Sequence, residues 1–269
     1  MSAAIFALVL FAIPPAQAAT SGDPGLIAQD IAGAGRLRMQ SQRLAKLYQQ
    51  AAMGMAAPVA SRQIGEAALE IDGELARLAR YARKPNVQRV HGRCQEIWLE
   101  LRATLKSNSG RAAIERVNQL ADELMIHTGK LAMLIEAEAE TPVGRLLDLS
   151  SRLNMLSQRL ARLYLLAQAG DKSQGVLIDI AQARKEFSAG LHELDTAREN
   201  TSASREAIAL AKNQWIFFEL AISQLNQGNR GDGRAAQHVA TSSERIAQVL
   251  DEASAQYARD YSGSLRAAR

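Results

Sequence analysis

Aromatic residues, cysteine and long apolar runs are scarce in this chain of 269 residues. Aromatics make up 4% of it although 47% is hydrophobic, so Ala and Leu fill most apolar positions, which favours long helices over sheets. The single cysteine, Cys94, excludes an intrachain disulfide, and we expect its thiol to be buried. Beyond the N-terminal segment no run of about 18 apolar residues occurs, so no later membrane-spanning helix is expected.

Blocks of like charge, metal-ligand clusters and catalytic motifs are also missing. The net charge is +4, and basic residues alternate with acidic ones, so nucleic-acid binding is not expected. There is no phosphate-binding loop, nucleophile elbow or acid–base pair, and we therefore predict a protein that is not an enzyme. We expect no metal or other cofactor, because the four histidines are scattered along the chain: His91, His127, His192 and His238.

Residues 1–19 have the pattern of a secretory signal peptide. A short apolar run over residues 3–13 is followed by two prolines and by Ala-Gln-Ala at 16–18, whose small residues fit signal-peptidase cleavage. Residues 1–19 contain no Lys or Arg, which leaves open a start further upstream. An uncleaved anchor is the alternative to cleavage. We expect cleavage, export and a periplasmic location.

One segment of 19 residues occurs twice. Residues 36–54 read RLRMQSQRLAKLYQQAAMG and residues 152–170 read RLNMLSQRLARLYLLAQAG, with 12 identical positions at an offset of 116. A repeat of this spacing indicates two copies of one domain. Because Arg, Gln and Ser accompany its apolar residues, we expect a helix that builds a core and also presents polar groups.

Apolar spacings of three and four divide each copy into four helices. The first copy spans residues 23–140 and the second 141–265, with breaks at loop residues such as Pro58 and the Gly-rich stretch 228–233. Short connections make neighbouring helices antiparallel. We therefore predict an all-α fold of two tandem up-down-up-down four-helix bundles. The fourth helix could run almost directly into Pro142 to form a long rod, or the copies could pack side by side as a pseudo-dimer.

The repeated helix has an apolar seam with polar flanks. In copy one, Gln40 takes a seam position that is Leu156 in copy two. Arg38 lies on one flank, and its counterpart in copy two is Asn154. We expect four arginines on the other flank to pair with carboxylates of neighbouring helices: Arg36, Arg43, Arg152 and Arg159. We place Trp98, Trp215, Met39, Met155, Tyr48 and Tyr164 in the packed interior.

Residues 32–44, AGAGRLRMQSQRL, resemble the first-helix signature of the PilJ-type sensory domain. They are also similar to the periplasmic P-box of the nitrate/nitrite sensor kinases NarX and NarQ, whose pattern AGxLRMQSxRL residues 34–44 match nearly letter for letter. Residues 151–160 are a looser match. The resemblance implies a four-helix periplasmic domain that often works as a dimer.

The resemblance also implies a site. In the nitrate sensors the first helices of two subunits meet, and a pair of arginines clamps one anion; by motif position these roles fall on Arg38 and on Gly35. A guanidinium offers paired donors to a planar oxyanion, and glycine permits close approach. Arg36, Gln42 and Asn154 are expected to assist. A side-by-side pseudo-dimer would hold Arg38 with Asn154, whereas a homodimer through the first helix of copy one would restore two arginines.

We therefore expect an exported binding protein that recognises a small anion, nitrate or nitrite by resemblance. No kinase, HAMP or methyl-accepting pattern occurs in these residues, so the signal is expected to pass to a separate partner: a membrane-bound sensor, a transporter or another periplasmic protein. The alternative is a structural or protein-interaction scaffold of helices without a small-molecule ligand.

Overall fold

The computed structural model describes residues 24–107, 110–137, 143–223 and 233–267, and within them every regular element is a helix. The predicted signal peptide, residues 1–19, and most of the Gly-rich stretch 228–233 lie outside the described residues. In chain order the elements are α1 (Pro24–Ala52), α2 (Ala57–Leu78), the short 3-10 helix η1 (Ala79–Arg83), α3 (Pro85–Thr104), α4 (Arg111–Glu136), α5 (Val143–Gln168), α6 (Gln174–Thr196), α7 (Ser202–Ser223) and α8 (Gly233–Ala267).

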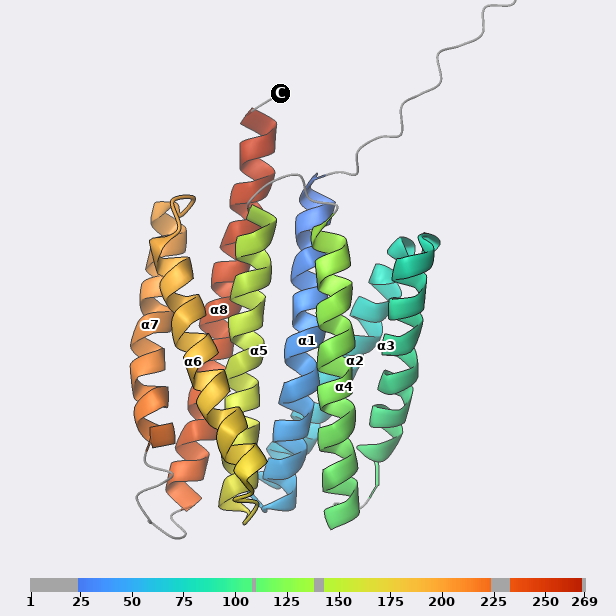
Figure 1. Ribbon diagram of the computed structural model, residues 1–269, viewed down its shortest axis with the longest axis vertical. Coiled ribbons are helices and arrows are strands. Elements are labelled where there is room, and N and C mark those ends of the chain that lie inside the picture. The colour runs from blue at the N-terminus through green and yellow to red at the C-terminus, as the bar shows by residue number, and fades with distance from the viewer. Residues whose placement is uncertain (1–23, 108–109, 138–142, 224–232, 268–269) are drawn as a thin grey trace, which may run out of the picture.

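The helices pack in two sets joined along α1 and α5. In the first half, α1 contacts α2 and α4, and α3 packs on α4; in the second, α5 contacts α6 and α8, and α7 packs on α8. Figure 1 shows α1 and α5 side by side in the middle of the molecule, both starting at the same end. The expectation of a long rod is therefore wrong, and the two halves lie beside each other.

Proline and glycine mark the ends of several helices as their backbone preferences require. Pro58 lies in the first turn of α2 and Pro85 begins α3, where a missing N–H leaves no intrahelical acceptor unpaired. Gly54 and Gly170 follow α1 and α5 with φ of +72° and +111°, a region that favours glycine after a helix. The two repeated segments thus end in the same way.

The interior is mostly aliphatic, and its few aromatic residues are buried as predicted. Trp98 and Trp215 are 2% and 6% exposed, and the Trp215 ring stacks on Phe187 with centroids 4.1 Å apart. Burial raises the pKa of the Cys94 thiol to about 12, so this cysteine is a packing residue. The other predicted interior residues are also buried: Met39, Met155, Tyr48 and Tyr164.

The two central helices are covered on nearly all sides. Between Ala28 and Gln50 almost every residue of α1 is buried, because α2, α4, α5 and α8 surround it. Two chains could meet through this helix only by displacing α5 or α8. The predicted homodimer through the first helix is therefore not supported, and α5 makes the corresponding contact within one chain.

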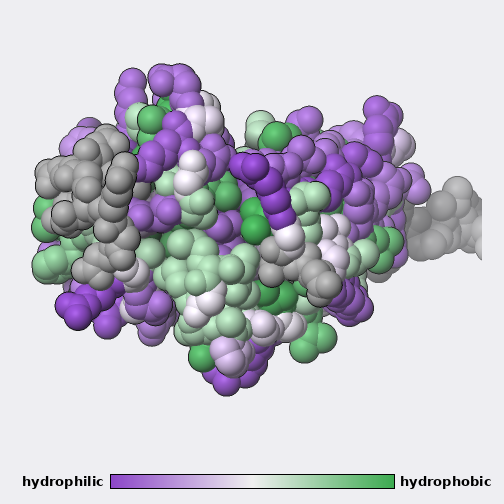
Figure 2. Space-filling model, turned by 90° about the horizontal axis from the view of Figure 1, so that it is seen from below, coloured by the Kyte–Doolittle hydropathy of each residue, from purple (hydrophilic) through white to green (hydrophobic). Residues whose placement is uncertain are grey.

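The surface at one end of the molecule is partly hydrophobic. Figure 2 views the end where α1 and α5 terminate, and hydrophobic residues gather in its middle with hydrophilic residues on both sides. Across the described ranges, none of the helices combines the length and the apolar character needed to cross a bilayer.

Candidate functional site at the junction of the two halves

The two repeated helices approach each other closely at Gly35 and Ser151, which are equivalent positions of the repeat. A Cβ atom placed on Gly35 would overlap the Ser151 side chain, so only glycine allows α1 to approach α5 this closely here. The predicted role of Gly35 in close approach is thus explained by contact within one chain. We call this contact between α1 and α5 the junction.

Equivalent glutamines show that α4 and α8 take corresponding places in the two halves. Gln42 Nε2 donates to the carbonyl oxygen of Ala121 in α4 at 3.1 Å, and Gln158 Nε2 donates to that of Ser243 in α8 at 2.9 Å. Ala121 and Ser243 therefore occupy equivalent places in the two halves. Gln42 also donates to Asp122 Oδ1 at 3.1 Å, so it serves packing against α4.

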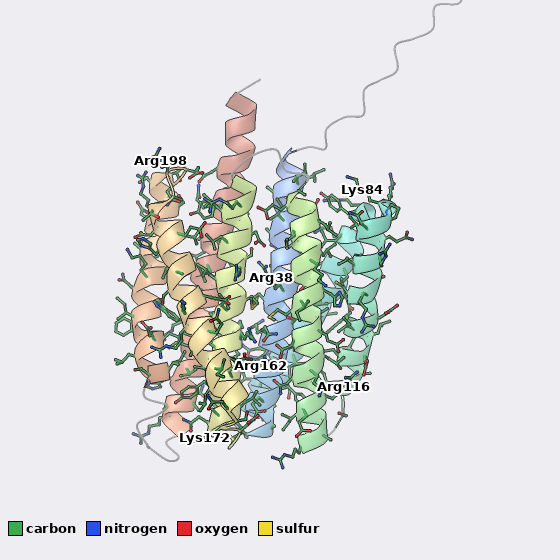
Figure 3. All side chains as sticks on the ribbon, in the orientation of Figure 1. Arg38, Lys84, Arg116, Arg162, Lys172 and Arg198 are labelled. Carbon is green, nitrogen blue, oxygen red and sulfur yellow. The ribbon has the colours of Figure 1, made fainter. Side chains whose placement is uncertain are left out.

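Two buried cations tie the halves together. Lys46 of α1, fully buried, donates to Gln158 at 2.7 Å, to Ser243 at 3.0 Å and to the carboxylate of Glu244 in α8. Its repeat equivalent Arg162, labelled in Figure 3, donates instead to α4, reaching Asp122 at 2.7 Å and Asn118 at 2.8 Å. Each central helix thus sends a cation into the opposite half.

The ionisation of these groups follows from their burial and pairing. Burial lowers the pKa of Lys46 to about 8, against the opposing effect of Glu244. Partial burial acts to raise the pKa of Glu244, but Lys46 and Arg43 outweigh it and hold that pKa at about 2. Both groups are therefore charged at neutral pH, and they form an ion pair inside the junction.

Lys46 and Arg162 are not among the site residues predicted from the sequence. A signal for them was present, because Lys46 lies four and eight residues after Gln42 and Arg38, which places all three on one helix face. The same spacing links Arg162 to Gln158 and Asn154. A polar stripe at this spacing on an otherwise apolar helix indicates a buried polar contact.

The α4 side of the junction is closed by an ion pair. Arg38 is 7% exposed, and its Nη2 donates to Oδ1 of Asp148 in α5 at 2.8 Å and to the Asp148 carbonyl oxygen at 3.2 Å. The side chain of Arg38 passes over Gly129 of α4 within van der Waals distance. A carboxylate of the same chain therefore lies where the resemblance places an anion.

The α8 side of the junction is hollow. A cavity of about 700 Å³ opens there between α1, α5 and α8, with Arg77 of α2 at its margin. Small residues leave the space unfilled, among them Ala32, Gly35, Ser151 and Ala255. Two further cavities, of about 440 and 630 Å³, continue along α1 and share Arg36 and Asp251 with it. We call the cavity of about 700 Å³ the α8-side cavity.

The five predicted site residues are divided between these two sides. Gly35, Arg36 and Asn154 line the α8-side cavity, whereas Arg38 and Gln42 face α4. Arg38 and Asn154 share no hydrogen-bond partner, because Asn154 Nδ2 donates to Asp251 at 2.8 Å and to the carbonyl oxygen of Ala247 at 3.2 Å.

The flanking arginines pair with carboxylates as predicted. Arg36 donates from Nε to Glu74 at 3.0 Å, and its equivalent Arg152 donates to Glu186 at 2.8 Å. Arg43 binds Glu244 and Arg159 binds Asp179, both at hydrogen-bonding distance. The seam residue Gln40 donates from Nε2 to Glu70 of α2, whereas its buried Oε1 has no hydrogen-bond partner among the described residues.

Two charged groups of the α8-side cavity are not in ion pairs. Asp251 accepts a hydrogen bond from Asn154, and among the described residues no cation pairs with it. Loss of hydration raises its pKa to about 6, against the effect of the Arg36 charge, although the side chain is open to the cavity. Arg259 donates to Gln256 at 2.6 Å and, within the described part of the chain, pairs with no carboxylate.

Residues 27–125 match the PilJ family, described as the type IV pili methyl-accepting chemotaxis transducer N-term. This stretch resembles a PilJ-type sensory domain. The match spans α1 to α3 and much of α4, and it supports the PilJ resemblance and a role in sensing or signal transduction. No curated protein and no solved structure matches the chain. The second copy and the likeness to the nitrate sensors stay predictions.

Proposed function

We propose that this protein is an exported, non-enzymatic sensory module in the periplasm that binds a small anion and passes the signal to a separate membrane-associated partner. Its two halves would be tandem copies of one PilJ-type four-helix bundle, joined as a pseudo-dimer. The match over residues 27–125 supports the sensory role, and the repeated segments 36–54 and 152–170 support the duplication. A homodimer through α1 is not part of the proposal.

The observation that carries the binding site is the α8-side cavity. It contains Gly35, Arg36 and Asn154 of the predicted site, together with Arg77 and Arg259. Arg38 is paired with Asp148 and only 9% of its side chain is exposed, so an added anion would have to displace that carboxylate, whereas Arg36, paired with Glu74, has 43% of its side chain exposed. We therefore place the anion in the cavity, where the exposed part of the Arg36 guanidinium can donate to it.

The position of the cavity provides a means of signalling. Its walls belong to both halves, since α1 comes from the first and α5 and α8 from the second. A ligand that bridges them would favour one packing of the halves over another, and a partner that contacts both would respond to the difference.

Thermal unfolding with and without millimolar nitrate, nitrite or chloride tests this proposal. Ligand at about 100 times its Kd would stabilise the folded state by about 2.7 kcal/mol. We expect a nitrate- or nitrite-specific rise in Tm that Arg36→Ala abolishes. Arg152→Ala is the matched control, because it removes the equivalent ion pair outside the cavity. Equal rises for all three anions, or no rise, would contradict the proposal.

The alternative is a helical scaffold that binds only protein, and one observation favours it. The charges buried in the junction satisfy one another, as in Lys46 with Glu244 and Arg162 with Asp122. In that case Arg36→Ala would leave every anion response unchanged and would weaken capture of a purified partner protein instead.

A further inference from the structure

We infer that the ligand of the α8-side cavity is a small zwitterion, with an ammonium group placed at Asp251 and a carboxylate placed at Arg259. This inference rests on the proposed function, because it concerns the same cavity, and it names a carboxylate group, carried by a zwitterion, as the anion in place of nitrate or nitrite. Two independent features carry it: the unpaired charges of the cavity and the comparison with the closed α4 side.

The first feature is the balance of charges around the cavity. Four charged side chains line it: Arg36, Arg77, Arg259 and Asp251. Arg36 is paired with Glu74, and Arg77 is paired with Asp30 and Glu74. Among the described residues this leaves one carboxylate, Asp251, and one guanidinium, Arg259, without an ionic partner. A ligand with one charge of each sign would satisfy both.

The spacing of these two groups sets the size of the ligand. Asp251 and Arg259 are eight residues apart on α8, which places their Cα atoms about 12 Å apart. The arginine side chain can shorten this span by several ångströms. The complementary molecule therefore has its ammonium and its carboxylate separated by a short carbon chain.

The wall between the two charges suits such a chain. Ala255 and Ala258 of α8 face the cavity, and Ala32 and Met39 of α1 also line it. A cavity of about 700 Å³ is within the range of pockets that hold small organic molecules and is far larger than one nitrate ion needs. Apolar methylene groups would fill the part that a simple anion leaves empty.

The second feature is the relation between the two sides of the junction. On the α4 side, Arg38 supplies a cation and Asp148 supplies a carboxylate. The repeat offset of 116 makes Asn154 the equivalent of Arg38 and Ala32 the equivalent of Asp148. At these two positions the α8 side therefore has neither the cation nor the carboxylate of the α4 side, and a zwitterionic ligand would supply one charge of each sign in their place.

The residue on α8 that corresponds to Gly129 of α4 also agrees with a cationic group on the ligand. Gly129 lies eight residues after Ala121, and Asp251 lies eight residues after Ser243, so these two positions are equivalent. Arg38 packs over Gly129 on the α4 side. The α8 side presents a carboxylate at the place where the α4 side accommodates a guanidinium, which suits a cation supplied from outside.

Isothermal titration of the full chain with three probes tests the inference. The probes are 6-aminohexanoate, which carries both charges, hexanoate, which carries only the carboxylate, and hexylammonium, which carries only the cation. We expect 6-aminohexanoate to bind at least tenfold more tightly than either of the others. Asp251→Asn should reduce its affinity to that of hexanoate, and Arg259→Gln should reduce it to that of hexylammonium.

Matched controls use charges outside the cavity. Asp179→Asn and Arg152→Gln each remove a charge from a surface pair, and both should leave the affinity for 6-aminohexanoate unchanged. Hexanoate binding as tightly as 6-aminohexanoate, with no effect of Asp251→Asn, would overturn the inference while leaving the proposed anion site intact. Binding of nitrate but of none of the three probes would do the same. Absence of binding by nitrate, nitrite and all three probes would overturn both.

Discussion

The two sides of the junction are built on the same repeated segment but differ in how they are filled. On the α4 side the pair Arg38–Asp148 closes the interface, and on the α8 side their equivalents Asn154 and Ala32 leave a cavity. The framework around them is shared, since Lys46 and Arg162 reach across in the same manner on both sides. Two substitutions at equivalent positions therefore separate a packed interface from a cavity able to admit a ligand.

Removing a carboxylate partner of the buried cations Lys46 and Arg162 should lower the free energy of unfolding more than any other change to the junction. Glu244→Gln leaves Lys46 buried without its carboxylate, and we expect a loss of about 3 kcal/mol of unfolding free energy. Asp122→Asn on the other side should have an effect of the same kind, but a smaller one, because Glu244 pairs with Arg43 as well. Urea unfolding measures both. A Glu244→Gln loss no greater than that of Arg152→Ala, an exposed pair worth about 1 kcal/mol or less, would contradict the buried ion pair.

Converting the closed side into an open one tests the comparison directly. Arg38→Asn or Asp148→Ala alone should destabilise the fold by about 2 kcal/mol, because each leaves a largely buried charge unpaired. The double variant reproduces the residues of the α8 side and should cost less than the sum of the two. A double-mutant cycle in urea measures this coupling, expected at about 1 kcal/mol or more. Additive losses would show that the two side chains do not act as a pair.

The close approach of α1 and α5 should be sensitive to one methyl group. Gly35→Ala introduces a Cβ that overlaps Ser151, and we expect a loss of about 1–2 kcal/mol through overpacking. Ser151→Gly, added to Gly35→Ala, exchanges the two equivalent residues approximately and should recover most of the stability. Thermal unfolding of the single and double variants decides this. Failure of Ser151→Gly to rescue would place the strain elsewhere in the junction.

The smallest expected effect is a dependence on pH from Asp251. Its folded pKa of about 6 lies above the ordinary value of 3.8, so the folded state favours the protonated form. This contribution is fully present below about pH 4 and is lost as the pH rises through 6. Solvent access to the carboxyl group keeps the effect small, with Arg36 and Arg43 opposing the upward shift and Glu70 adding to it.

Urea midpoints between pH 4.5 and pH 7 measure that dependence as the difference between the protein and Asp251→Asn. The folded pKa values of Lys46, about 8, and Glu244, about 2, lie outside this range and are common to both proteins. A midpoint of the protein that rises relative to that of Asp251→Asn as the pH falls below 6 agrees with the raised pKa. A difference that is constant over the range would contradict it.

Much of the helical fold was predictable because its causes are local. Proline in the first turn of α2, glycine after α1 and α5, and apolar spacings of three and four depend on residues close together in the chain. The carboxylate partners of Arg36 and Arg152 were also expected, since arginines flanking an apolar seam face the adjoining helices. The partners themselves, Glu74 and Glu186, could not be named from sequence.

The site was predicted less well, for a physical reason that Arg38 makes plain. A buried guanidinium needs an anionic partner, and the sequence does not say whether that partner comes from solution or from the chain. Asp148 lies 110 residues away along the chain and meets Arg38 only because α5 packs beside α1. The same packing enclosed Lys46 and Arg162 and opened the cavity at Asp251.

Periodicity and repetition are properties of the chain, and they are enough to predict an all-helical protein, a repeated segment and the residue types that could meet at its repeated helix. The packing of the helices sets the halves side by side, neutralises Arg38 within the chain and leaves the space on the α8 side. Charge neutralisation and cavities depend on which surfaces meet, and this meeting joins residues more than 100 positions apart.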